Sequence, residues 1–186
     1  TVLDNNDQPV SNSYVKAYSD DWPLTYPDGS GFERTEPNGI CSFHIPRGNW
    51  TIIAGGGSVY NTAGSGKGLF LTGNVSLQTD TSLVLQPDHA IRITFKDRSN
   101  ATVDADRVYI GIQRMSPNCC MPDAGRTNSG QCLTETNSNE DMTFFLRRDP
   151  TPGTEGYYIF ADHADPTHDI EIQANDYELY HIHFDG

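Results

Sequence analysis

Histidines and carboxylates near the C-terminal end of the sequence are the residues whose types and spacing best suit a metal site. His181 and His183 lie two positions apart, so on a strand they share one face. Imidazole is a common ligand of transition metals, and His163, Asp165, His168 and Asp169 precede them. A metal centre also needs an enclosed pocket and supporting hydrogen bonds, which the sequence does not indicate. The pattern therefore leaves open a metal site and a strand surface that faces solvent or another subunit, and it favours the second.

Acidic turns supply the oxygen ligands that calcium prefers. Asp4-Asn5-Asn6-Asp7 is one such turn, and residues 162–169 contain another. Neither has the Asp-x-Asp-x-Asp-Gly spacing of a dedicated calcium loop, and Asn and Asp also form turns through their own side chains. We therefore expect no cofactor, with calcium as the alternative.

Sequence signatures of catalysis are missing. A serine nucleophile needs a base beside it, and paired carboxylates need a cleft; no Gly-x-Ser-x-Gly motif occurs. The stretch Gly64-Ser65-Gly66-Lys67-Gly68 lacks the spacing and the following helix of a phosphate-binding loop. The sequence predicts a protein that is not an enzyme and has no catalytic residue.

Aromatic residues in two expected loops, 22–33 and 55–68, are candidates for stacking on sugar rings. They are Trp22, Tyr26, Phe32 and Tyr60. Such aromatics also close the ends of β-sandwiches, so both interpretations stay open here.

The four cysteines, Cys41, Cys119, Cys120 and Cys132, allow three complete pairings. A bond between the adjacent Cys119 and Cys120 would form a strained ring. One of them paired with Cys132 closes a short loop, and the other then either joins Cys41 or leaves it as a free, buried thiol. The even number of cysteines and three Asn-x-Ser/Thr sequons favour an oxidising compartment. We therefore predict a secreted or cell-surface protein, processed at its N-terminus, with glycans at Asn49, Asn74 and Asn100.

The charge of the chain excludes several classes of partner. With a formal net charge of −13 and only 12 Lys and Arg residues, it repels the phosphates of nucleic acids and anionic membrane surfaces. No run of 18 apolar residues is present that would insert into a membrane. The expected partners are therefore proteins or neutral glycans.

The elements that must position these residues are strands. β-branched and aromatic residues dominate the apolar stretches, and Gly, Pro, Asn, Asp and Ser separate them. Residues 40–45 alternate, with Cys41, Phe43 and Ile45 on one side, and 91–96 alternate in the same way. Asn38-Gly39 predicts a turn, and Trp50 is expected to face the core while Asn49 faces outward. The class is all-β.

Two stretches of the chain begin alike, because Thr1-Val2-Leu3-Asp4 aligns with Thr94-Phe95-Lys96-Asp97. A duplicated module of about 90 residues suits the size of a sandwich domain. We predict two tandem immunoglobulin-like β-sandwich modules, residues 1–87 and 88–186, with long loops at 22–33, 55–68 and 115–140.

The first module resembles the carboxypeptidase regulatory-like (transthyretin-like) domains over about residues 1–87. The segments that carry the resemblance are Val2-Leu3-Asp4, Gln8-Pro9-Val10, 14–18, 34–43 and 46–52. The resemblance implies an immunoglobulin-like sandwich, and such modules serve as spacers, adhesion units, sugar-binding appendages or parts of surface assemblies. Members usually have a longer first strand, whereas only three residues precede Asp4 here.

A short first strand predicts an open groove in the first module, which a strand of another chain would complete. We therefore expect a non-enzymatic structural or interaction subunit of an extracellular or cell-surface assembly, built as a pilus-like filament by strand complementation. Its partner would be a second copy or another surface protein. The alternative is a secreted carbohydrate-binding module.

Overall fold

The computed structural model describes residues 1–19, 25–26, 33–57, 60, 65–96, 99–102, 104–112, 131–139, 141–147, 157–162, 171–174 and 181–182. In several strands only the backbone is described. The regular elements over these ranges are strands, with no helix among them, so the all-β class is confirmed at this level. No helix in this part of the chain is long and apolar enough to cross a membrane.

The chain divides into two compact units. Unit 1 contains residues 1–58, 69–89 and 145–152, and unit 2 contains residues 59–68, 90–144 and 153–186. The change from unit 1 to unit 2 near residue 89 lies close to the expected boundary at 87–88. However, residues 59–68 belong to unit 2 and residues 145–152 belong to unit 1. The arrangement as two tandem immunoglobulin-like modules stays a prediction.

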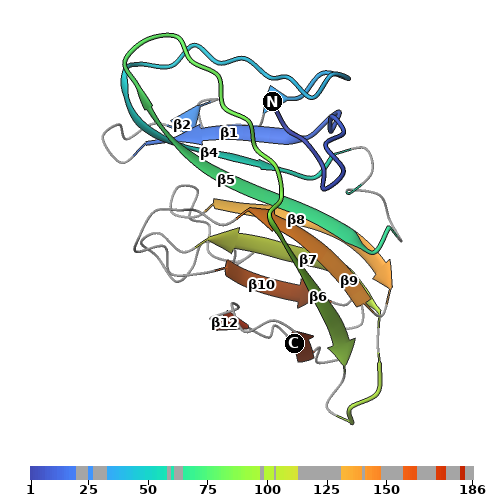
Figure 1. Ribbon diagram of the computed structural model, residues 1–186. Coiled ribbons are helices and arrows are strands. Elements are labelled where there is room, and N and C mark those ends of the chain that lie inside the picture. The colour runs from blue at the N-terminus through green and yellow to red at the C-terminus, as the bar shows by residue number, and fades with distance from the viewer. Residues whose placement is uncertain are drawn as a thin grey trace. The chain divides into compact units, whose positions relative to one another are not determined.

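Unit 1 is built on an antiparallel sheet whose central strands are β1 (Tyr14–Tyr18), β4 (Gly48–Gly55) and β5 (Lys67–Leu77). Figure 1 shows these three strands side by side. Two short strands, β2 (Thr25–Tyr26) and β3 (Glu33–Arg34), both pair with β1.

The register of these ladders groups Trp50, Ile52 and Ala17 on one face of the sheet, while Ile53 is buried on the other, so both faces contribute to the apolar core of unit 1. Ala17 lies opposite Ile52, and Trp50 lies opposite Val75. Directly paired residues share a face, and Trp50, Ile52 and Ala17 are buried there. Asn49 is exposed on the other face, so the expected orientations of Asn49 and Trp50 are confirmed. The indole nitrogen of Trp50 donates a hydrogen bond to the carbonyl oxygen of Pro46 at 2.9 Å.

The first residues of the chain form a short extended segment at one edge of this core. Val2 is buried and bridges in parallel to Leu85. Its amide donates to the carbonyl of Gly39 at 2.8 Å, while the amide of Leu3 donates to Leu85 at 2.9 Å. Gly39 has a φ of 74° and a Cβ there would lie 2.6 Å from the carbonyl oxygen of Val2, so the Asn38-Gly39 turn needs glycine.

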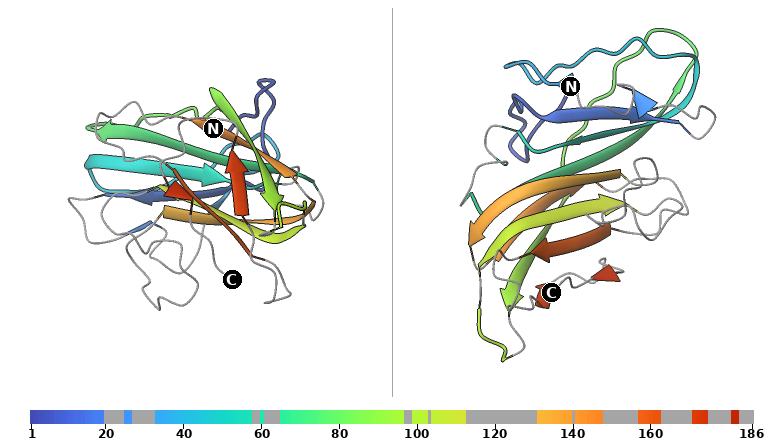
Figure 2. Two further views of the ribbon diagram at one scale, coloured as in Figure 1. Left: turned by 90° about the horizontal axis from the view of Figure 1, so that it is seen from below. Right: turned by 180° about the vertical axis from the view of Figure 1, so that it is seen from behind.

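Unit 2 contains two groups of strands. In the first, β11 (Glu171–Ala174) pairs with β6 (His89–Lys96), which is followed by β9 (Asp141–Arg147). In the second, β12 (His181–Ile182), β10 (Tyr157–Asp162), β7 (Ala105–Ile112) and β8 (Gln131–Asn139) follow one another, with β12 parallel to β10. The right-hand view of Figure 2 shows β10, β7 and β8 side by side.

The alternation predicted for β6 is confirmed. Ile91, Ile93 and Phe95 are buried, whereas Arg92 is exposed and forms an ion pair with Asp141 of β9. Period-two burial is what a strand with one covered face requires. The same periodicity places Met142 and Phe144 of β9 in the core.

Candidate functional site

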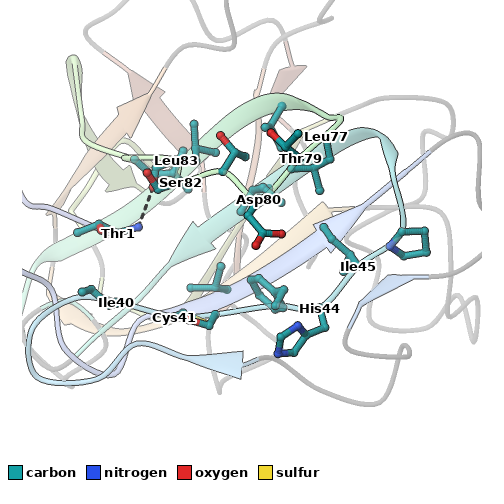
Figure 3. Close-up of a pocket in the computed structure, with 18 of the residues that line it drawn as sticks. Thr1, Ile40, Cys41, His44, Ile45, Leu77, Thr79, Asp80, Ser82 and Leu83 are labelled. Atoms are coloured by element: carbon teal, nitrogen blue, oxygen red, sulfur yellow. Dashed lines mark hydrogen bonds between the residues drawn. The ribbon is translucent and has the colours of Figure 1, made fainter.

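The main candidate site is an open groove within unit 1 that has a volume of about 930 Å³. Two segments outside the sheet, residues 40–47 and 78–83, form its walls. Val15, Ile52 and Val75 of the sheet line its floor. Figure 3 shows Ile40, Cys41, His44 and Ile45 along one wall, and Leu77, Thr79, Ser82 and Leu83 along the other.

The wall formed by residues 40–47 alternates in exposure, as an extended chain does. Ser42 and His44 are exposed, whereas Cys41, Phe43 and Ile45 are partly buried; all five residues line the groove. The predicted facing of these residues is therefore confirmed, but they form no strand in a ladder. A strand needs a neighbour to pair with, and the groove lies where that neighbour would be.

The opposite wall continues from the end of β5. Leu77 and Leu83 line the groove and are only partly buried, as is Val75 on the floor. Leu85, further along, is fully buried beside Val2. Along this wall, burial is thus complete at Leu85 beside Val2 and incomplete at Leu77 and Leu83.

The backbone of both walls lacks ladder partners among the described residues. Residues 41–45 and 78–82 make no backbone-to-backbone hydrogen bond with any other described residue. Backbone amides and carbonyls in folded proteins are nearly always paired with protein or water. These two segments therefore form two open edges that face the same groove.

The amino group of Thr1 lies at one end of the groove. It donates a hydrogen bond to the carbonyl oxygen of Leu83 at 2.7 Å (Figure 3). Partial burial lowers the pKa of this amino group below its ordinary value of 8.0, because burial disfavours the charged form. The hydrogen bond to Leu83 therefore holds segment 1–3 at this end of the groove.

Cys41 is the one cysteine described in the walls. Its thiol forms no disulfide with any described residue. Burial raises its pKa above the ordinary value of 9.0, and the nearby carboxylate of Glu33 adds to the effect. A thiol with a raised pKa is mostly protonated and a poor nucleophile at neutral pH.

The side chains of the other three cysteines are not described by the structure. Cys119 and Cys120 lie outside the described residues, and only the backbone of Cys132 is described, on β8. Both the bonded and the free alternatives for Cys41 stay predictions.

The three predicted glycosylation sites are all exposed. Asn49 and Asn74 belong to sequons that pair with each other across β4 and β5, with Asn49 opposite Ser76 and Thr51 opposite Asn74. The buried hydroxyl of Thr51 donates to Oδ1 of Asn74 at 2.8 Å. Asn100 accepts a hydrogen bond from Lys96 at 3.0 Å. Sequence reasoning recognised each sequon but not their pairing, because strand register cannot be read from a triplet.

The expected sugar-stacking aromatics are not brought together by the described residues. Tyr60 is buried, with 3% of its surface exposed, so its ring does not meet a ligand in solution. Trp22 and Phe32 lie outside the described residues, and only the backbone of Tyr26 is described. The carbohydrate platform stays a prediction without support from this part of the chain.

The structure describes only some of the metal and calcium candidates. His163, His168 and His183 lie outside the described residues, and His181 is described by its backbone alone. At the turn of residues 4–7, Oδ1 of Asp4 accepts hydrogen bonds from the amides of Asn6 and Gln8 at 2.7 and 2.9 Å. This carboxylate therefore stabilises the turn itself. No group of metal-ligating side chains occurs among the described residues.

Comparison with known proteins adds no relative. No protein-family model matches the chain, and neither the curated proteins nor the solved structures contain a significant match. The resemblance to carboxypeptidase regulatory-like domains stays an expectation that depends on its motifs.

Proposed function

We propose that unit 1 accepts an extended strand from another chain, and that the protein is a non-enzymatic structural or interaction subunit of an extracellular or cell-surface assembly. Repetition of this contact would build a filament. The observation that carries the proposal is the groove, in which partly buried apolar side chains lie between two backbone segments without ladder partners.

Strand addition suits this groove because an added strand would pair with the backbone of both walls and bury the apolar side chains between them. A strand laid between residues 41–45 and 78–82 would pair with the backbone on either side, each hydrogen bond contributing about 0.5–1.5 kcal/mol net. Each large apolar side chain buried contributes roughly 1.5–3 kcal/mol. Association costs an estimated 4–15 kcal/mol, so the apolar side chains and the backbone pairs are both needed for a stable complex.

The proposal is tested by one substitution in a wall of the groove and a matched control outside it. Phe43→Arg places a charge in the groove, where Phe43 is partly buried; Asn5→Arg places the same side chain at an exposed position that does not line the groove. We expect the wild-type chain and Asn5→Arg to form oligomers or filaments in light scattering and negative-stain microscopy. Phe43→Arg should remain monomeric.

A second pair separates loss of binding from loss of folding. Leu83→Asp changes the opposite wall at a partly buried position, while Val84→Asp changes a side chain that is 50% exposed. Circular dichroism identifies the variants that fold. A folded Phe43→Arg or Leu83→Asp chain that assembles like the wild type, or a wild-type chain that is monomeric at high concentration, contradicts the proposal.

A further inference from the structure

We infer that the folded chain accepts an N-linked glycan at Asn100 but not at Asn49, which accepts one only before β4 joins its ladders. The inference is independent of the groove and of the proposed function. It rests on what the side chains and backbone of the two sequons, Asn100-Ala101-Thr102 and Asn49-Trp50-Thr51, already contact.

Transfer of a glycan involves two side chains of the acceptor. The bond that forms joins Nδ2 of asparagine to the anomeric carbon of the sugar. The bond from that carbon to the pyrophosphate of a lipid-linked oligosaccharide breaks, and the asparagine amide loses one proton to a base of the transferase. The motif also demands a hydroxyl two residues after the asparagine. A folded chain therefore presents a usable sequon only where the amide and the hydroxyl are both exposed and the backbone can enter the enzyme.

The sequon of Asn49 does not meet this requirement, although the Asn49 side chain itself is exposed. Thr51 is 2% exposed, and its hydroxyl already donates to Oδ1 of Asn74 at 2.8 Å. The backbone is held on both edges of β4, because Asn49 and Thr51 pair with β5, Thr51 pairs with β1, and Oγ of Ser19 donates to the carbonyl oxygen of Asn49 at 2.7 Å. Trp50 between them is buried. Presenting this sequon to an enzyme would require β4 to leave the sheet.

The sequon of Asn100 does meet the requirement. Asn100, Ala101 and Thr102 are all exposed and lie between β6 and β7. Asn100 has a φ of 68°, the left-handed conformation that asparagine adopts in turns. Its Oδ1 accepts a hydrogen bond from Nζ of Lys96 at 3.0 Å, which uses the oxygen of the amide and not the nitrogen that reacts. An isolated bridge between Lys96 and Thr102 closes the turn, so the sequon lies outside the ladders in an exposed segment that enzymes can reach.

The fold thus separates two sites that the motif alone treats alike, since both sequons have threonine at the third position. A glycan on Asn49 has to be added while β4 is unpaired, and the exposed Asn49 side chain then keeps it on the solvent side of the sheet. A glycan on Asn100 can be added before or after the chain folds.

The test combines the folded, unglycosylated chain with a purified oligosaccharyltransferase and a lipid-linked oligosaccharide. Peptide mass spectrometry follows modification at each sequon, and synthetic peptides of residues 46–54 and 97–105 give the rate of each sequon without the fold. We expect Asn100 to react within about threefold of its peptide, and Asn49 roughly tenfold or more slower than its peptide, because reaction at Asn49 waits for β4 to open. Thr102→Ala should abolish modification of Asn100, and Thr102→Ser should retain it.

A variant that opens β4 supplies the second arm. Ile52→Ala removes a buried side chain from β4 and leaves the sequon of Asn49 intact, so the rate at Asn49 should rise toward that of its peptide, whether the strand loosens or the chain unfolds. Ser42→Ala, at an exposed position outside the ladders, should leave the rate at Asn49 unchanged. A folded wild-type chain in which Asn49 reacts as fast as its peptide overturns the inference. So does an Asn100 that is slowed as much, relative to its peptide, as Asn49 is.

Discussion

At the scale of single residues, Cys41 reports on the groove. Its side chain is partly buried in the wall, and the surrounding apolar groups disfavour the thiolate. Glu33 and Glu36 raise its pKa further, while the amino group of Thr1 opposes them. The balance is a pKa above 9.0 in the folded chain.

The reaction of Cys41 with iodoacetamide therefore has a predictable pH dependence. The rate should rise with pH through a midpoint above 9.0, the ordinary value for cysteine, and should be slower at pH 8 than that of a free cysteine peptide. Because the pKa is raised in the folded state, the free energy of unfolding should decrease as pH rises above 9.0. A labelling midpoint below 9.0 would show that the thiol is not buried as described.

At the scale of elements, the β4–β5 ladder holds two sequons against each other. Thr51 is buried at 2% exposure, and its hydroxyl donates to the exposed Asn74. A glycan on Asn74 would attach to Nδ2 and leave Oδ1 free to accept this bond. Glycosylation and the cross-strand contact are therefore compatible.

Replacing Asn74 by Ala should lower the free energy of unfolding by about 1–3 kcal/mol, because the buried hydroxyl of Thr51 loses its acceptor. Ser76→Ala, two residues along the same strand at an exposed position, should change it by less than about 0.5 kcal/mol. Urea unfolding of both variants, made without glycans, measures the difference. Equal stability of the two would mean that the Thr51–Asn74 bond contributes nothing.

Local pattern predicted the orientation of individual elements better than their pairing. The alternation of residues 40–45 and 91–96, the turn at Asn38-Gly39 and the buried Trp50 all follow from period and turn chemistry, and the structure confirms them. The sequence did not reveal that residues 40–45 lack a ladder, since pairing depends on a neighbouring strand and not on the segment's own pattern.

At the scale of the whole molecule, the functional interpretation depends on segments from far apart in the sequence. The groove combines residues 1–2, 40–47 and 77–83, which no local motif connects. The disulfide candidates Cys119 and Cys120, and most of the histidine candidates, lie outside the described residues. The groove therefore does not test the predicted disulfides or the predicted histidine site.

Assembly must also overcome the charge of the chain. Copies that each have a net charge of −13 repel one another, so the proposed assembly requires a specific contact with apolar burial and backbone pairing.

Hydrogen exchange of the backbone amides of residues 41–45 and 78–82 tests the central claim most directly. These residues make no backbone-to-backbone hydrogen bond with another described residue, and we predict that their amides exchange rapidly in the dilute monomer. In the assembled protein the inserted strand should slow their exchange by about tenfold or more, because paired amides exchange only on opening. Assemblies in which both wall segments exchange as fast as in the monomer would contradict the account.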